Sequence, residues 1–314
     1  MVAGQADGSI AISLKDATGT SDSLDLTIDQ AITQNNDTTV DTFTSAITNI
    51  TTTGVETLNV TSTGTLSTAV TAGNETDVAV NGLAITNNDL ATLNVDGDQA
   101  FTFTSAAGMT ELTTINLSEN TAGGTVNVSA AATDGTAAAI TITGSQGDDV
   151  ITGSGNADTI SGGAGNDTIT GGAKADTLSG GEGNDKFVLA AATDSTLVNL
   201  DVITDFSANT FGVGADGAVT SKGATGVAAD DLTGDLIDLT VSALTDLEVS
   251  VQSNASDAQT FIQNAANDAT LSAVNVALDS SSSKLYIDID NNGTVDSVME
   301  LTGVTTIDEA AFLI

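Results

Sequence analysis

A unit of nine residues, repeated five times without interruption, constrains the fold of this chain more than any other feature. Residues 144–188 read GSQGDDVIT, GSGNADTIS, GGAGNDTIT, GGAKADTLS and GGEGNDKFV. An aspartate and an apolar residue hold fixed places in each unit: Asp149, Asp158, Asp167, Asp176 and Asp185, and Ile151, Ile160, Ile169, Leu178 and Phe187. Because a flexible linker has no reason to place one apolar residue at every ninth position, the period predicts a stack of short repeated elements.

The order of residue types within the unit predicts a turn followed by a short strand. The first six residues are rich in glycine, which adopts positive φ without steric cost, and the last three alternate as a strand does. Two units then complete one coil of eighteen residues, and neighbouring coils lie about 4.8 Å apart, as paired strands do. The apolar residue points inward and supplies a small core.

The acidic turns predict a calcium site. Backbone carbonyls and aspartate carboxylates in the gap between stacked turns are the oxygen ligands that calcium prefers. The chain has no Cys and no His, so zinc and copper are poor candidates. We expect the ligands to be the five repeat aspartates and the fourth-position glycines, Gly147, Gly165 and Gly183. A column of like charges opposes folding, so the coil is expected to fold only with its metal.

The fourth position of the unit predicts a difference between the two sides of the stack. Repeats one, three and five carry glycine there, whereas repeats two and four carry Asn156 and Lys174. Asparagine tolerates a left-handed backbone better than lysine does. We therefore expect two ions between the odd turns and no more than one between the even turns.

The nonapeptide resembles the repeat of the RTX (repeats-in-toxin) family. This resemblance implies a parallel β-roll, calcium binding and export by type I secretion. It implies no particular activity, because proteases, lipases, adhesins and surface-layer proteins carry the same roll. The segments DVITDF (201–206) and GDLIDL (234–239) are similar to the pair that closes many RTX rolls. By that resemblance Asp201 and Asp205 complete the last calcium site; the alternative is that both are exposed acids between apolar strand positions.

The composition excludes several functions. The net charge is −37 over 314 residues, and the basic residues are five lysines, so no basic patch can bind nucleic acid or an anionic membrane. No run of eighteen apolar residues predicts a membrane span. The start, MVAGQADGSIAISLKD, lacks the basic and apolar regions of a signal peptide, which fits an exporter that reads the C-terminus.

The absence of histidine argues against catalysis. It excludes a His-assisted Ser or Cys nucleophile and an H-E-x-x-H zinc site. A glycosidase that uses only carboxylates stays formally open, but eight Phe, one Tyr and no Trp offer few platforms for sugar rings. We therefore expect no enzyme.

The first part of the chain, residues 1–143, predicts a parallel β-solenoid. Brief alternating segments rich in β-branched residues occur at 9–14, 23–28, 55–60, 77–80, 90–95, 101–103, 112–117, 125–128 and 139–143. Three of them, VETLNV, LATLNV and LTTINL, share one pattern and look like rungs. The alternative is an antiparallel sandwich, with hairpin turns at Asp96-Gly97 and Asp134-Gly135. No boundary separates this part from the first nonapeptide, which favours the solenoid.

This part also resembles, more loosely, the threonine-rich region of Caulobacter-type surface-layer (S-layer) proteins. The resemblance rests on the VETLNV-like rungs and on composition. Such proteins are usually much longer, so the chain is interpreted as a C-terminal fragment of one.

The last part, residues 189–314, is expected to be a β-rich cap on the roll. Residues 207–233, rich in Gly and Ala, are interpreted as a surface loop. A short helix is expected in DAQTFIQNAAN, capped by Ser256, with Phe261, Ile262, Ala265 and Ala266 as its apolar face. The final segment, LTGVTTIDEAAFLI, is similar to the tail that a type I exporter reads.

One acidic segment of this cap has two interpretations. Asp288, Asp290, Asn292 and Asp296 resemble the start of a calcium loop. The twelfth position is Met299 rather than Glu, so the EF-hand template fails. A hairpin turn and an additional weak calcium site both stay open.

The sequence therefore predicts an all-β protein of three parts, 1–143, 144–188 and 189–314. The predicted function is that of a secreted structural protein whose folding is driven by calcium after export and which assembles with copies of itself into a surface layer, matrix or filament. The alternative is the calcium-binding C-terminal module of a type I-secreted adhesin or biofilm-matrix protein. The expected partners are other copies of the chain and, during export, the type I exporter.

Overall fold

The computed structural model describes residues 9–13, 22–32, 42–66, 78–85, 89–129, 138–191, 194–207, 235–239, 246–266, 273–290, 292–307 and 311–313. The chain divides into two compact units. The first comprises Met1–Asn156 and Gly162–Gly165, and the second comprises Ala157–Ser161 and Asn166–Ile314. The expected division into three parts at residues 143 and 188 stays a prediction.

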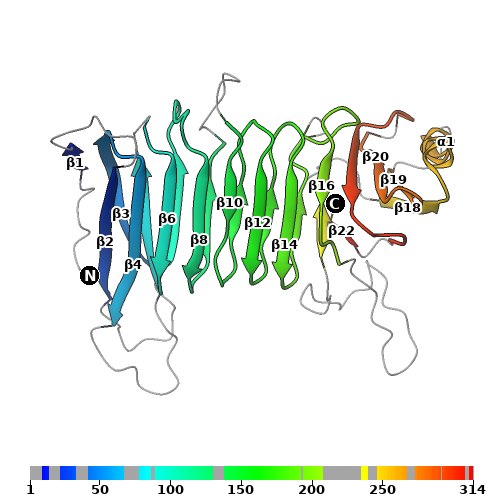
Figure 1. Cartoon of the computed structure of the whole chain (residues 1–314). Coiled ribbons are helices and arrows are strands. Elements are labelled where there is room, and N and C mark those ends of the chain that lie inside the picture. The colour runs from blue at the N-terminus through cyan, green and yellow to red at the C-terminus, as the bar shows by residue number, and fades with distance from the viewer. Residues whose placement is uncertain are drawn as a thin grey trace, which may run out of the picture. The chain divides into compact units, whose positions relative to one another are not determined.

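The first unit consists of two parallel sheets, and successive strands alternate between them. The odd-numbered strands follow the order β1-β3-β5-β7-β9-β11. The even-numbered strands follow the order β2-β4-β6-β8-β10, and Figure 1 shows these five side by side. The bounds are β1 Ser9–Ser13, β2 Ser23–Ile32, β3 Thr42–Thr53, β4 Thr57–Leu66, β5 Val78–Ile85, β6 Thr92–Gly97, β7 Ala100–Ser105, β8 Thr114–Asn120, β9 Gly124–Asn127, β10 Thr141–Thr143 and β11 Val150–Thr152. A chain that alternates between two parallel sheets is a solenoid, so the solenoid prediction is confirmed and the antiparallel sandwich is wrong for this unit.

The pattern shared by the three predicted rungs stacks in register. Leu58 pairs with Leu93, and Leu93 pairs with Ile115, in adjacent parallel strands. All three side chains are almost completely buried. The rungs read from the sequence therefore form one column of the core.

The structure adds one strand to the sequence prediction for this unit and excludes one turn of its alternative. Strand β3 was not predicted, because its apolar residues do not alternate regularly, and its register with β5 shifts between Ile47 and Ile50. The hairpin turn that the sandwich alternative placed at Asp96-Gly97 is absent, because β6 and β7, which flank it, belong to different sheets. Gly97 ends β6 with φ of 119°, and a Cβ there would lie 1.9 Å from the backbone oxygen of Ser62 in the preceding coil. Asp134-Gly135 lies outside the described residues.

The solenoid continues into the first nonapeptide without interruption. Strand β10 pairs with β8 and strand β11 pairs with β9, both in parallel. The first unit therefore joins an N-terminal solenoid to the beginning of the roll through the same two sheets.

The second unit by itself has parallel strands in the later repeats and ends in a mixed sheet. One sheet has the order β13-β15-β17-β22. In the other sheet, β14 pairs with β16 and β16 pairs with β21, both in parallel. Strand β20 lies between β21 and β19 and is antiparallel to both, and β18 pairs with β19 in parallel. The bounds are β13 Thr168–Thr170, β14 Thr177–Glu182, β15 Lys186–Val188, β16 Asp201–Ile203, β17 Leu236–Asp238, β18 Asp246–Gln252, β19 Ala273–Asp279, β20 Lys284–Asp288, β21 Ser297–Leu301 and β22 Phe312–Leu313. Strand β12, Thr159–Ala164, has residues in both units.

One helix, α1 (Ala255–Ala266), covers β18, β19 and β20 (Figure 1). Its Ala258 and Ile262 are buried in a cluster with Tyr286 and Val298. The helix was predicted, but its cap was not: the side chain of Asn254, rather than Ser256, accepts the backbone N–H of Asp257 at 3.0 Å. Among the described residues, no helix has the length and apolar character that crossing a bilayer requires.

Replacing Leu93 by alanine is expected to lower the free energy of unfolding by about 2–5 kcal/mol, because a fully buried rung residue leaves a cavity. The outward neighbour Thr92 is the control: Thr92→Ala is expected to change it by no more than about 0.5 kcal/mol. Urea unfolding with saturating calcium measures both values. Equal losses in the two variants contradict the stacked-rung core.

Candidate metal centre

The nonapeptides place their two recurring residues in the interior. Ile151, Ile160, Ile169, Leu178 and Phe187 are buried, as the sequence predicts. The five repeat aspartates are buried as well, and none is more than 2% exposed. A buried carboxylate must be neutralised by a proton, by hydrogen-bond donors or by a cation, so the surroundings of each one decide what the turns can bind.

The aspartates form a ladder between coils. Asp176 Oδ1 accepts the backbone N–H of Asp158 at 2.7 Å, and Asp185 Oδ1 accepts the backbone N–H of Asp167 at 2.9 Å. In both pairs the acceptor lies eighteen residues, one full coil, after the donor. We call this arrangement the aspartate ladder. The carboxylates therefore tie neighbouring coils together as well as line the turns.

The ladder continues beyond the repeats. Asp201 Oδ1 accepts the backbone N–H of Asp176 at 2.9 Å, and Asp235 Oδ1 accepts that of Asp185 at 3.1 Å. Asp201 was singled out from the sequence, but Asp235 was not. The available signal was its phase: Asp235 stands two residues before the buried Ile237, as Asp185 stands two before Phe187.

Asp205, the other residue expected to complete the last site, lies outside the ladder. It is exposed, and its carboxylate accepts hydrogen bonds from the Ser179 hydroxyl at 2.6 Å and from the backbone N–H groups of Gly180 and Gly181 at 3.0 Å. These donors make Asp205 a cap on the fifth turn, and its role as a metal ligand stays a prediction.

The first glycine of the unit leaves room for the carboxylate of the same unit. A Cβ on Gly171 would lie 2.5 Å from Asp176 Oδ2, and a Cβ on Gly180 would lie 2.0 Å from Asp185 Oδ2. Any larger residue at this position displaces the carboxylate. The glycine at position one is thus required by a close approach within the turn.

The electrostatics of Asp176 make it a candidate site for a cation. Oδ2 of Asp176 is buried, and among the described residues no group donates a hydrogen bond to it. Burial, together with the charges of Asp201, Asp158 and Asp194, raises the pKa of Asp176 to about 8. Burial also raises the pKa of Asp201 to about 7. Carboxylate oxygens without a compensating donor, beside glycine backbone, fit the hard, oxygen-coordinated calcium ion.

The backbone φ angles of the turns differ between the first two repeats and the last three, and not between odd and even repeats. The positive-φ positions are Gly163, Gly172 and Gly181 at the second place of the unit, and Gly165, Lys174 and Gly183 at the fourth. Gly147 and Asn156, at the fourth place of repeats one and two, do not have positive φ. Lys174, at φ of 75°, thus adopts the left-handed conformation that its residue type disfavours. The expected preference of calcium for the odd side stays a prediction.

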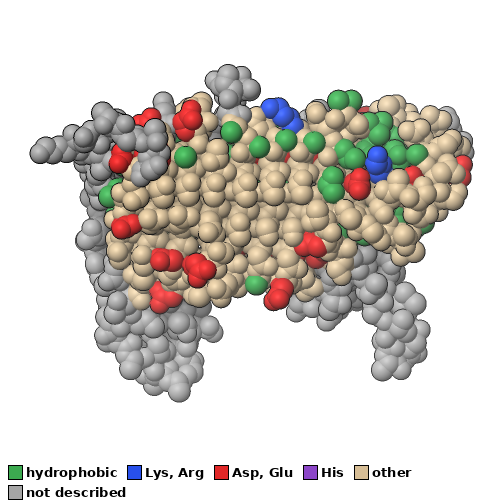
Figure 2. Space-filling model, in the orientation of Figure 1, with side chains coloured by type: hydrophobic (Ala, Val, Ile, Leu, Met, Phe, Trp, Pro, Cys, Tyr) green, Lys and Arg blue, Asp and Glu red, His purple; other side chains and the backbone are tan. Residues whose placement is uncertain are grey.

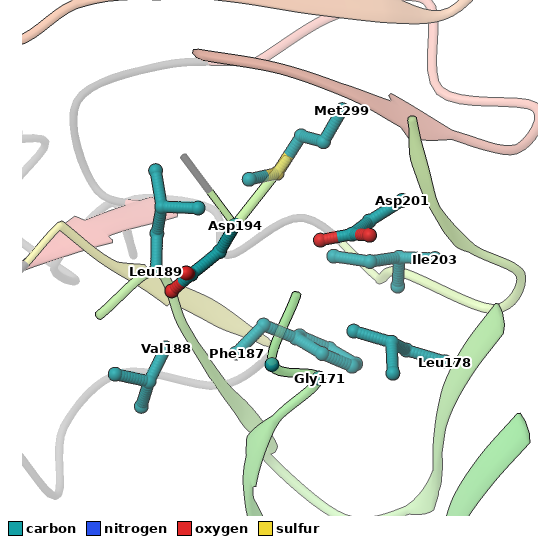
Figure 3. A pocket seen from close by; sticks show the side chains of 10 residues that line it. Gly171, Leu178, Phe187, Val188, Leu189, Asp194, Asp201, Ile203 and Met299 are labelled. Carbon is teal, nitrogen blue, oxygen red and sulfur yellow. The ribbon is translucent and has the colours of Figure 1, made fainter. Parts of the chain in front are cut away.

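A small pocket lies beside the ladder in the second unit. Asp194 and Asp201 line it together with Phe187, Leu189 and Met299, and Figure 3 shows the Asp201 carboxylate pointing into it. Its volume of about 20 Å³ is enough for one water molecule or ion and too small for an organic substrate. Asp194 was not predicted from the sequence, because it lies outside the nonapeptide period.

A second group of acids lies in the cap. The carboxylates of Asp288, Asp290 and Asp296 come within 4.8 Å of one another in the turn between β20 and β21. These strands are antiparallel, so the predicted hairpin is confirmed. Asp288 accepts the backbone N–H of Gly293 at 2.9 Å, and Asp296 accepts that of Ile289 at 2.7 Å. The additional weak calcium site at this turn stays a prediction.

The expected loop at 207–233 lies almost entirely outside the described residues. Only Ser207 belongs to them, and its backbone N–H donates to Asp235 Oδ2 at 2.7 Å.

A parallel roll of nine-residue units with inward apolar residues and buried turn aspartates defines a class of calcium-binding repeat. Residues 141–169 and 161–195 match the RTX calcium-binding nonapeptide repeat (four copies). This part of the chain therefore carries RTX repeats. Calcium is the ion that these repeats bind, and the buried aspartates fit it. No curated protein matches the chain.

Proposed function

We propose that this protein is a secreted structural protein that folds when calcium fills the acidic turns and then assembles with copies of itself. The observation that carries the proposal is the aspartate ladder, above all the buried Oδ2 of Asp176, to which no described group donates. At neutral pH this oxygen needs either a proton or a cation. A bound calcium ion supplies the positive charge that neutralises the carboxylates.

The proposed ligands are the ladder aspartates of the later repeats, completed by Asp201, together with carbonyls of the turn glycines. Gly165 and Gly183 have φ of 112° and 136°, so a side chain at either place strains the turn. With each coil linked to the next by a carboxylate, binding at one turn also orders its neighbour. Folding and metal binding are therefore coupled along the stack.

Secretion fits the same chemistry. A chain with a net charge of −37 and no Cys has neither disulfides nor internal charge balance to hold it folded. In a calcium-poor cytosol such a chain stays unfolded and suits export, and extracellular calcium then folds it. We propose that a type I exporter reads its C-terminal segment.

The first unit carries the surface that we propose for assembly, on the outer face of its even-numbered strands. Two rows of uncharged side chains begin at β4, with Thr57, Thr92, Thr114 and Thr141 in one and Asn59, Asn94 and Asn116 in the other. The side chains of neighbouring rungs bond to each other: Asn94 Nδ2 donates to Asn59 Oδ1 at 2.9 Å. Figure 2 shows this part of the surface as mostly neither hydrophobic nor charged. Strongly acidic copies repel one another least across a neutral face.

The test compares particles formed with and without calcium. Negative-stain electron microscopy and sedimentation are expected to show ordered sheets or filaments of the wild-type chain only after calcium is added. Thr92→Glu with Thr114→Glu is expected to abolish them while leaving calcium binding unchanged. The control places two charges on exposed turns, in Thr121→Glu with Ser129→Glu, and is expected to assemble.

Persistent monomers of the wild-type chain at saturating calcium contradict the assembly proposal. Monomers that bind a glycan array then support the adhesin alternative.

A further inference from the structure

The first nonapeptide differs from the last three at its second position, where it has Ser145 instead of a positive-φ glycine. Ser145 donates twice to one oxygen of Asp149: its backbone N–H lies 2.6 Å and its hydroxyl 2.9 Å from Oδ2. The other oxygen, Oδ1, accepts the backbone N–H of Gly124 at 2.5 Å. Three protein donors thus converge on one buried carboxylate.

Asp176 holds the equivalent place in the fourth repeat and has a different environment. Both carboxylates are buried, Asp149 at 2% and Asp176 at 1% exposure. The second position of that repeat is Gly172, with φ of 109°. Oδ1 of Asp176 accepts one backbone N–H, and among the described residues nothing donates to Oδ2. The two turns therefore bury the same group, but only the first surrounds both of its oxygens with donors.

The serine hydroxyl also shapes the first turn. Gly147 N–H donates to Ser145 Oγ at 3.2 Å, and neither residue has positive φ. The turn packs directly on the preceding coil: a Cβ on Gly147 would lie 2.6 Å from the nitrogen of Gly123, and Gln146 N–H donates to the Asn120 carbonyl at 3.0 Å. The first turn is thus closed by hydrogen bonds within the protein.

We propose that Ser145 takes the place of a calcium ion at the first turn, so that Asp149 is not a calcium ligand and metal binding is confined to later turns of the roll. This inference rests on the proposed calcium binding of the later repeats. On this proposal the coil that contains the first turn is the last coil of the solenoid that folds without metal. The proposal differs from the expectation that Asp149 and Gly147 bind calcium, and the test below decides between the two.

The test measures the number of calcium ions bound per chain, by isothermal titration calorimetry and by metal analysis after gel filtration. Ser145→Gly restores the residue found at this position in repeats three to five and removes the hydroxyl. It is expected to raise the number by about one ion. The control, Ser129→Gly, removes an exposed serine hydroxyl that donates to Asn127 Oδ1 at 2.7 Å, and is expected to leave the number unchanged.

A second pair of variants tests the same point from the carboxylate side. Asp176→Asn is expected to lose about one ion, and Asp149→Asn to lose none. An unchanged number of ions in Ser145→Gly, or the loss of an ion in Asp149→Asn, overturns the proposal that Ser145 takes the place of an ion. Neither result contradicts the proposed calcium binding of the later repeats. A wild-type chain that binds no calcium overturns the proposed function and this inference together.

Discussion

Removing calcium at pH 8 is expected to unfold the later repeats and the strands stacked on them. Each ion that binds only the folded chain adds about 2.7 kcal/mol when its concentration is a hundred times its dissociation constant. Two such ions match the lower end of the roughly 5–15 kcal/mol that stabilises a whole domain. Without them the buried, donor-poor Asp176 and its neighbours keep their mutual repulsion and their desolvation cost.

Far-UV circular dichroism and thermal melting, with calcium and with excess chelator, measure this effect. We expect the chelated chain to lose a large part of its strand signal and to regain it when calcium is returned. Magnesium at the same concentration is the control, because its strict octahedral geometry suits a carbonyl-lined turn poorly. Equal strand content and equal melting temperatures in the two states contradict calcium-dependent folding.

Protonation at acidic pH is expected to stabilise the metal-free chain, as bound calcium does at neutral pH. In the folded, metal-free chain burial raises the pKa of Asp176 to about 8 and that of Asp201 to about 7, whereas both carboxyls have a pKa of 3.8 before folding. The folded state then binds more protons than the unfolded state between about pH 4 and pH 8. The stability of the metal-free chain therefore rises as the pH falls through this window, by up to about 1.4 kcal/mol per pH unit and per group.

The measurements are the far-UV strand signal and the melting temperature of protein dialysed free of metal, from pH 8, where the later repeats are expected to be unfolded, to pH 5. Both are expected to increase steadily toward acid, and Asp176→Asn, which removes one titrating group, is expected to flatten the increase. In the presence of calcium the trend is expected to reverse, because protons compete with the metal for the same oxygens. A metal-free melting temperature that stays constant or falls toward pH 5 contradicts the raised pKa values.

Periodicity predicted most of the fold. The nine-residue unit was sufficient to predict an inward apolar column and buried aspartates, because both follow from a strict repeat of one short turn and one short strand. The shared rungs VETLNV, LATLNV and LTTINL likewise stack as expected. Where the repeat is interrupted the prediction fails: β3 has an irregular register, and Asp235 lies 50 residues after its ladder partner Asp185.

The candidate site was harder to predict than the fold, because single side chains decide it. The sequence shows Ser145 as a small departure from the repeat, and its two bonds to Asp149 exist only in the folded turn. The helix cap was also decided by a single side chain. Ser256 and Asn254 are both good capping residues, and the position of the first helical turn determines that Asn254 is the cap.

The aspartate ladder has a direction. In each described pair the carboxylate belongs to the later coil and the N–H to the earlier one, so every coil is completed by the coil that follows it. The final rungs are completed by Asp201 and Asp235, which lie beyond the last repeat. A stack with this polarity depends on its carboxyl end, because Asp201 and Asp235 supply the acceptors for the backbone N–H groups of the last two repeat aspartates.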